Sequence, residues 1–213
     1  MTKFVALNIS ISEDGYMAGP NQSLENPMGE GGMPLHSWVF PTKAFREQFG
    51  NEGGEVGKDN DFVTRGFSNI GASILGRNMF GPVRGKWGEE NWRGWWGEEP
   101  VFKHPVFVLT HYPRESIHFG NGTVFHFITE GVERAHALAL ESANGNDVRV
   151  GGGASTLRQF IELGLLDELH LAVSPIKLCA GEKLLTNPED QLRNYRKLES
   201  VQTSVEHVTY LKR

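Results

Sequence analysis

The sequence predicts an α/β protein whose helices cover both faces of a mostly parallel β-sheet. Short apolar runs with the length of buried strands alternate along the chain with segments whose apolar residues recur at helical spacing. Two strand-like segments near the C-terminus, residues 195–202 and 204–212, lie close enough in the chain to pair as an antiparallel hairpin. We therefore expect a sheet that is covered on both sides and has antiparallel strands at its C-terminal edge.

The first part of the chain predicts two strands separated by a long excursion. Residues 4–11 are apolar and β-branched, which is typical of a buried strand, and Asp14-Gly15 then marks a turn. Between residues 21 and 57, seven glycines frame one aromatic segment, 38–49, where we expect a helix. A further helix is expected over residues 58–69 and a short strand over residues 72–75.

After a glycine-rich loop at residues 81–97, which holds four tryptophans, the pattern becomes regular. Helical spacing predicts one helix over residues 132–140, ended by Asn144-Gly145, and another that ends at Gly164. The second of these helices has one apolar face, formed by Leu157, Phe160 and Ile161. Apolar or alternating runs predict strands over residues 106–110, 123–128, 148–150 and 169–173.

The composition excludes several classes of function. The chain has 213 residues with 21 Lys and Arg against 26 Asp and Glu, a formal net charge of −5, so it lacks the basic balance of a general nucleic-acid binder. Its single cysteine, Cys179, excludes an intramolecular disulfide and a thiolate-rich zinc site, and we expect it to be buried. No histidine spacing indicates a metal site, and no apolar run reaches the roughly 18 residues of a membrane span. We expect one cytoplasmic domain over residues 1–213.

The strongest local signal is the glycine segment that follows the strand at residues 148–150. A strand that ends in Gly151-Gly152-Gly153 and opens a helix presents unpaired backbone N–H groups at the positive end of a helix dipole, which favours phosphate. The dinucleotide fingerprint G-x-G-x-x-G matches only in part, because Thr156 stands at the place of the last glycine. A tight turn without a ligand and a Rossmann dehydrogenase are the alternative interpretations.

Two further strand ends carry polar side chains. Gly76-Arg77 follows the strand at residues 72–75, at the edge where open α/β sheets bind ligands, and an arginine there can hold a phosphate through two hydrogen bonds. Thr110 and His111 stand at the end of the strand at residues 106–110. An arginine after a strand can also be an ordinary solvated side chain, so the interpretation depends on the three segments together.

These segments occur in an order found in a known group of proteins. Residues 12–20, 74–80, 106–110 and 150–154, followed by residues 165–171, resemble the dihydrofolate reductase-like superfamily. The resemblance is to the bacterial branch that includes the reductase domain (RibD C-terminal domain) of bifunctional riboflavin-biosynthesis proteins. It implies a three-layer αβα dihydrofolate reductase-like fold that binds NADPH.

The resemblance also implies roles for individual residues. Met17 and Ala18 would lie on a mobile loop beside the nicotinamide, and Thr110 and His111 would lie near the 2′-phosphate. The adenosine side would be held by Gly76, Arg77, Asn78 and Met79. The pyrophosphate would be held by Gly151, Gly152, Gly153, Ala154, Ser155 and Thr156.

The sequence defines the substrate side less well. We expect Tyr16, Trp38 and Trp87 to face the substrate, although the tryptophan-rich loop could equally form a dimer contact or pack on itself. Dihydrofolate reductases carry an acidic residue on their first helix, whereas residues 36–42 of this chain contain none and Glu47 lies further along. The riboflavin-pathway reductases usually have a lysine at the place of Tyr16. No residue is therefore assigned a catalytic role.

Together these features predict an NADPH-dependent oxidoreductase that transfers a hydride to a C=N or C=O bond of a small planar heterocycle of pterin, pyrimidine or flavin type. A nucleotide-binding protein of the same fold without turnover, acting as a sensor or scaffold, is the alternative. A twofold homodimer is expected, because it is the commonest closed oligomer.

Overall fold

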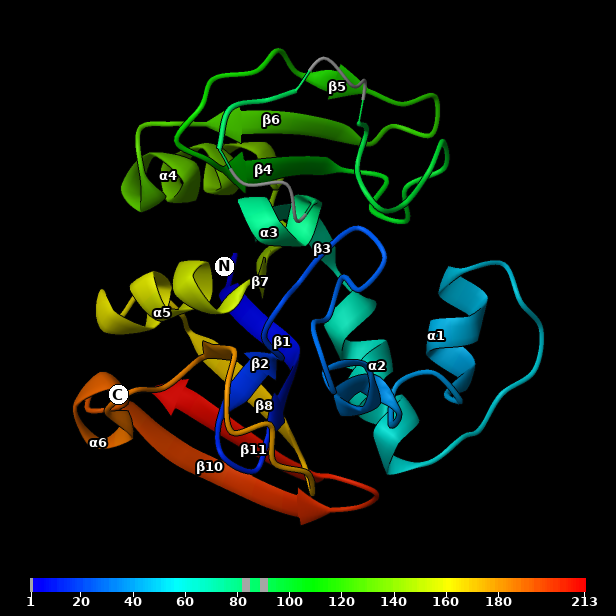
Figure 1. Cartoon of the computed structure of the whole chain (residues 1–213), viewed down its shortest axis with the longest axis vertical. Helices are drawn as coiled ribbons and strands as arrows, with labels where there is room; N and C mark the ends of the chain where they lie inside the picture. The colour runs from blue at the N-terminus through cyan, green and yellow to red at the C-terminus, as the bar shows by residue number, and fades with distance from the viewer. Residues whose placement is uncertain (1, 82–84, 89–91) are drawn as a thin grey trace.

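The fold is built on one large β-sheet (Figure 1). The computed structural model describes residues 2–81, 85–88 and 92–213. The main sheet has nine strands in the order β10-β11-β8-β1-β7-β3-β4-β6-β5. Their bounds are β1 (Phe4–Ser12), β3 (Ile70–Gly76), β4 (Pro105–Leu109), β5 (Ile117–His118), β6 (Val124–Ile128), β7 (Asp147–Gly152), β8 (Glu168–Ser174), β10 (Tyr195–Gln202) and β11 (Glu206–Lys212).

The six neighbouring strands from β8 to β6 run parallel. β10 and β11 form the predicted antiparallel hairpin, and β11 pairs with β8. The prediction of a mostly parallel sheet with antiparallel C-terminal edge strands is therefore confirmed. The sequence does not predict the short antiparallel β5 at the other edge, or the small separate sheet of β2 (Tyr16–Ala18) and β9 (Glu182–Lys183).

Helices cover both faces of the sheet, which gives three layers. α4 (Val132–Ser142) and α5 (Ala154–Glu162) pack on one face, at the left in Figure 1, while α2 (Lys58–Phe67) lies on the other face with α1 (Lys43–Gln48) beside it. None of the helices in the described ranges combines the length and the apolar character that a membrane span needs. The shorter helices are η1 (Met33–His36), α3 (Arg77–Phe80) and α6 (Pro188–Gln191).

The central strand β1 contains a β-bulge. Its pairing with β8 shifts register between Ala6 and Ile9, where Asn8 adopts a φ of 59°. Phe4 and Ala6 before the bulge, and Ile9 and Ile11 after it, pack into the same hydrophobic cluster. This cluster also buries the apolar stripe of α5, so β1 lies in the middle of the largest core.

The excursion before α2 is less helical than the sequence predicts. Trp38 and Val39 are core residues, 2% and 8% exposed, and lie outside the helix. α1 begins only at Lys43, because Thr42 caps it by accepting a hydrogen bond from the Phe45 N–H at 3.3 Å.

Two other expectations need correction. α2 ends at Phe67 instead of residue 69, because Ser68 is extended and Asn69 adopts a left-handed φ of 57°. The prediction that Cys179 is buried is wrong: it is exposed on the connection between β8 and β9. The predicted loop at 81–97 includes residues 82–84 and 89–91, which lie outside the described residues, and the remainder of that loop contains only turns and bends.

Candidate functional site

The carboxyl ends of β3, β4 and β7 lie next to one another at one edge of the sheet (Figure 1). β3 pairs in parallel with both neighbours, and Gly76 at its end lies opposite Leu109 at the end of β4. The segments that follow the three strands begin at Arg77, Thr110 and Gly153, and they come together from distant parts of the sequence. This is the edge at which open α/β sheets bind ligands.

The last two residues of β7, Gly151 and Gly152, allow side chains from two other elements to reach the backbone. A Cβ atom on Gly151 would lie 3.0 Å from Met79 Cε, and a Cβ atom on Gly152 would lie 3.1 Å from Met17 Cε. Gly152 also has a φ of +124°, a conformation that other residues rarely adopt. The structure therefore brings Met17 of β2, Met79 of α3 and the glycine segment together.

The first turn of α5 opens onto free space. No described atom lies within 4 Å of a Cβ atom built on Gly153, and no side chain caps the helix. The backbone N–H groups of Ala154, Ser155 and Thr156 are in the first turn, where an α-helix offers them no partner. Gly76 packs against this turn, since a Cβ atom there would collide with Thr156 Oγ1. Bare N–H groups at the positive end of a helix, with room in front of them, suit a phosphate group.

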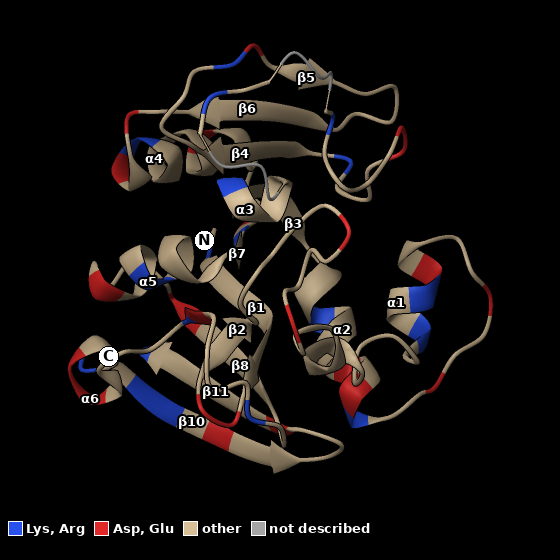
Figure 2. Cartoon of the chain, in the orientation of Figure 1, with Lys and Arg blue, Asp and Glu red and all other residues tan. Residues whose placement is uncertain are grey.

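Arg77 begins α3 and is its only charged residue (Figure 2). Its Nη1 atom donates to the Thr110 hydroxyl at 3.5 Å and to the Gly85 carbonyl at 3.4 Å, while its Cζ atom lies 3.1 Å from the centre of the Trp87 ring. Its Nε and Nη2 atoms are buried and have no hydrogen-bond partner among the described residues. Burial, and then the positive charge of Arg114, lower the pKa of Arg77 to about 10, so the group is charged at neutral pH.

The remaining predicted residues lie around the same edge. Tyr16 is half-buried on β2, and its hydroxyl donates to the Cys179 carbonyl at 3.4 Å. Ala18 is 5% exposed at the end of β2, Asn78 is half-buried on α3, and His111 is exposed after β4.

Two tryptophans that were expected to face the substrate lie elsewhere. Trp38 is almost fully buried, and its indole N–H donates to the Ser10 hydroxyl at 2.9 Å, so the side chain belongs to the core. Trp87 lies against Arg77, on the side predicted for adenosine, and donates to the Tyr112 carbonyl at 2.9 Å. A large aromatic side chain predicts burial, but it does not predict the partner.

The tryptophan-rich loop was open to three interpretations. Trp87, Trp92 and Trp96 pack against the hydrophobic cluster that contains Phe80 and Phe125, and the Trp95 ring lies 5.0 Å from that of Trp92. Within the described part of the loop, packing on the protein itself therefore accounts for these side chains.

A buried chain of hydrogen bonds on the α2 face has no counterpart in the sequence prediction. The Asn8 N–H donates to His170 Nδ1 at 3.2 Å, and His207 Nε2 lies 2.8 Å from the Asp59 carboxylate. Between them, His170 Nε2 lies 3.0 Å from His207 Nδ1. Because His170 Nδ1 is an acceptor, the protons lie on the two Nε2 atoms. Both imidazole rings stack on Phe62, with 4.5 and 4.1 Å between ring centres.

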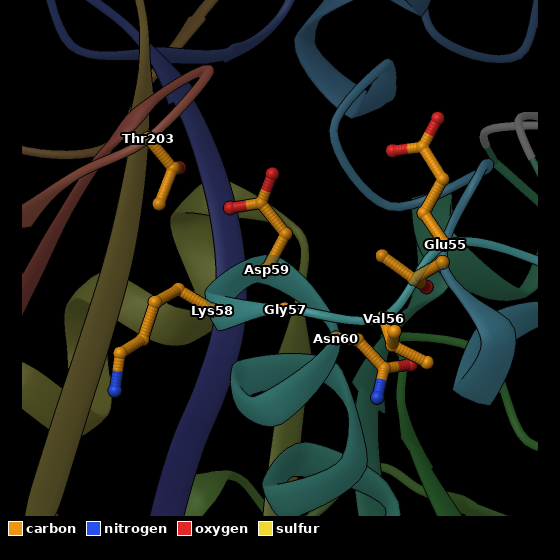
Figure 3. Close-up of a pocket in the computed structure, with 8 residues that line it drawn as sticks. Glu55, Val56, Gly57, Lys58, Asp59, Asn60 and Thr203 are labelled. Carbon is orange, nitrogen blue, oxygen red and sulfur yellow. The ribbon is translucent and has the colours of Figure 1, made fainter.

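The buried end of this chain of hydrogen bonds, His170, is uncharged, and the other end, Asp59, lies near the surface. Burial lowers the pKa of His170 to about 3, so its ring is neutral. Burial alone would raise the pKa of Asp59, but hydrogen bonds with Thr203, His207 and other groups lower it overall. Asp59 lines a cavity of about 150 Å³, and Figure 3 shows its carboxylate directed toward Thr203, with Glu55 on the opposite side. This cavity is separate from the residues gathered at the strand ends.

The strand order and the glycine segment after β7 define the class: a dihydrofolate reductase-like α/β fold. The dihydrofolate reductase from Enterococcus faecalis, solved with NADP(H) and RAB-propyl, is similar with a TM-score of 0.54 and 15% identity. That likeness covers 98% of this chain and 96% of the other. Within this class, the chain belongs to the RibD C-terminal domain family, whose family model matches residues 3–210.

Two further solved structures share the fold. A candidate riboflavin biosynthesis protein from Shewanella sp. PV-4 gives a TM-score of 0.59 at 20% identity, over 100% of this chain and 99% of that one. The diaminohydroxyphosphoribosylaminopyrimidine deaminase/5-amino-6-(5-phosphoribosylamino)uracil reductase from Thermotoga maritima gives 0.53 at 12% identity. This chain is covered completely there, but it spans only 57% of the Thermotoga protein. No curated protein matches the chain.

Proposed function

We propose that the protein is an NADPH-dependent reductase of a small planar heterocycle of pterin, pyrimidine or flavin type. The family and the fold support an oxidoreductase. The observation that carries the cofactor assignment is the meeting of two phosphate-binding features at neighbouring strand ends. One is the open first turn of α5 at Gly153, and the other is Arg77, whose Nε and Nη2 atoms have no partner among the described residues.

The residues present fit a dinucleotide that carries a 2′-phosphate. The backbone of residues 151–156 would hold the pyrophosphate. Positions 151 and 152 need glycine, because a larger side chain there would press on Met79 or Met17. Arg77 would hold the 2′-phosphate, with Thr110 fixing its Nη1 atom. Bound NADPH would supply the hydride.

The chain's own contribution is orientation and the exclusion of water. Met17 on β2 and Met79 on α3 close over the glycine backbone from two sides, and Leu75 lies beneath Gly151. Such apolar contacts restrict how a planar ring can lie against the strand ends. We expect Tyr16, next to Met17 on β2, to face the substrate.

Titration of the parent and of Arg77→Ala with NADPH and NADH tests the cofactor assignment. We expect Arg77→Ala to weaken NADPH binding by about 1.5–3 kcal/mol, the usual worth of hydrogen bonds to a charged group, and to leave NADH binding nearly unchanged. Equal losses for the two cofactors would remove Arg77 from this role. NADPH oxidation with a panel of pterins, pyrimidines and flavins tests the reductase itself. Tight NADPH binding without any turnover would instead support a sensor or scaffold.

A further inference from the structure

A second arginine, Arg114, contacts the same indole ring as Arg77. Its Cζ atom is 4.7 Å from the centre of the Trp87 ring, where that of Arg77 is at 3.1 Å. Arg114 also lies 5.2 Å from the ring centre of Phe127 and 5.7 Å from that of Phe80. Two guanidinium groups, one from the end of β3 and one from the connection between β4 and β5, therefore contact one indole.

The unused donors of the two arginines have a geometry that suits phosphate. In Arg77 they are Nε and Nη2, whose N–H bonds point to the same side of the planar group and form a two-pronged fork. In Arg114, Nη2 donates to the Trp92 carbonyl at 2.5 Å, whereas Nη1 is buried and has no partner in the described part of the chain. Buried donors are nearly always bonded in folded proteins, so several unbonded ones together indicate a missing acceptor.

The protein does not neutralise these two charges. Among residues 2–81, 85–88 and 92–213, no carboxylate forms an ion pair with either guanidinium group. By contrast, the nearby Arg93 forms an ion pair with Glu98, with 3.4 Å between its Nε atom and the carboxylate. Burial is the first cause that lowers the pKa of both arginines; the second is the charge of Arg114 for Arg77 and the charge of Arg93 for Arg114. A doubly negative group beside Arg77 and Arg114 would offset these positive charges.

We infer that Arg114 binds the same phosphate monoester as Arg77, and that Trp87 positions both guanidinium groups for it. A ring contact uses the face of a guanidinium group and hydrogen bonds use its edge, so stacking on Trp87 leaves the edges free. The inference rests on the proposed function, under which the monoester is the 2′-phosphate of NADPH. Arg114 is then a residue that determines the preference for NADPH over NADH.

Calorimetric titration with NADPH, NADH and adenosine 2′-phosphate tests this role. The variants are Arg114→Gln, Arg114→Lys and, as a matched loss of charge on the exposed strand β10 at the opposite edge of the sheet, Arg196→Gln. We expect Arg114→Gln to weaken binding of NADPH and of adenosine 2′-phosphate by about 10-fold or more, and binding of NADH by less than about 2-fold. Arg114→Lys keeps the charge and should recover part of the loss, while Arg196→Gln should match the parent.

The outcomes separate the inference from the proposed function. Unchanged affinity of Arg114→Gln for adenosine 2′-phosphate, or equal losses for NADPH and NADH, would overturn the inference. A parent that binds adenosine 2′-phosphate but not NADPH would overturn the proposed function and leave the arginine pair standing. A parent that binds neither compound would overturn both.

Trp87 is tested as a positioning residue. Trp87→Leu should weaken NADPH binding several-fold without changing NADH binding, and Trp87→Phe should restore most of it, because a phenyl ring still offers a face to the cations. Equal NADPH affinity in Trp87→Leu and the parent would remove the positioning role. Melting temperatures of all variants show whether the folded protein is being compared.

Discussion

Arg77 lies half-buried at the end of β3 with two nitrogen atoms that nothing in the described protein engages, whereas His170 is fully buried in β8 with both ring nitrogen atoms bonded. Arg77 and His170 thus differ in whether the protein itself satisfies their buried polar atoms. Bonded groups add to the stability of the fold, and unbonded ones lower it until a ligand arrives. This contrast between a candidate ligand-binding arginine and a structural histidine can be tested by substitution at each place.

The largest expected effect is the loss of cofactor binding in Gly153→Val. The added side chain would enter the open space before α5, which lies clear of the described protein, so we expect NADPH binding to be abolished while the melting temperature stays close to that of the parent. A titration of the folded variant with NADPH measures this. A turn without a ligand predicts normal NADPH affinity.

Substitutions at two other glycines serve as comparisons for Gly153→Val. Gly152→Val should also abolish binding, but it should lower stability by roughly 1–3 kcal/mol because of the φ of +124° and the contact with Met17. Gly120→Val is the matched control, since this glycine also faces open space and lies in the connection between β5 and β6. It should leave both quantities unchanged.

The α2 face should respond in the reverse manner. Asp59→Ala leaves His207 Nε2 without its acceptor, so we expect a loss of about 1–3 kcal/mol in the free energy of unfolding and no change in NADPH affinity. Urea denaturation measures the first quantity. Asp190→Ala, which breaks an exposed pair with Arg193, is the control and should cost less than about 1 kcal/mol. Equal losses in the two variants would mean that the buried hydrogen bonds stabilise the fold no more than an exposed ion pair does.

The last expected effect is a dependence of stability on pH. The folded pKa of His170 is about 3, below its unfolded value of about 6.5, so its contribution is complete above about pH 6.5 and declines as the pH falls toward 3. The lowered pKa of Asp59 acts in the same direction, at lower pH. His170→Phe should therefore show a shallower fall of unfolding free energy between about pH 6.5 and pH 4. An identical slope in the variant would contradict this role.

The fold was predictable because its long elements carry clear periodicity. β8 alternates, α5 repeats at helical spacing, and the six parallel strands follow from the alternation of the two types along the chain. β2, β5 and β9 have only two or three residues each and depend on their tertiary partners, so no pattern marks them.

The candidate site was predictable where the backbone itself forms it and less so where side chains from distant loops complete it. The glycine segment and Gly76-Arg77 stand at strand ends that any parallel sheet would bring together. The position of Trp87 depends on how its loop folds back on Arg77, and Arg114 has no motif around it. One of the buried histidines does have a signal in the sequence. His170 lies between two core leucines in β8, and a polar residue at such a place needs a hydrogen-bond partner.

The bulge in β1 changes which face of the sheet the residues after Asn8 point toward. In an unbroken strand only every second residue faces one side, yet β1 fills a single cluster with even-numbered residues before Asn8 and odd-numbered residues after it. The extra residue therefore lets the apolar side chains on both sides of Asn8 point to the same face of the sheet. Removing it would turn Ile9 and Ile11 from this cluster to the other face of the sheet and bring Ser10 into the cluster, so the length of this strand is as much a part of the fold's specification as its composition.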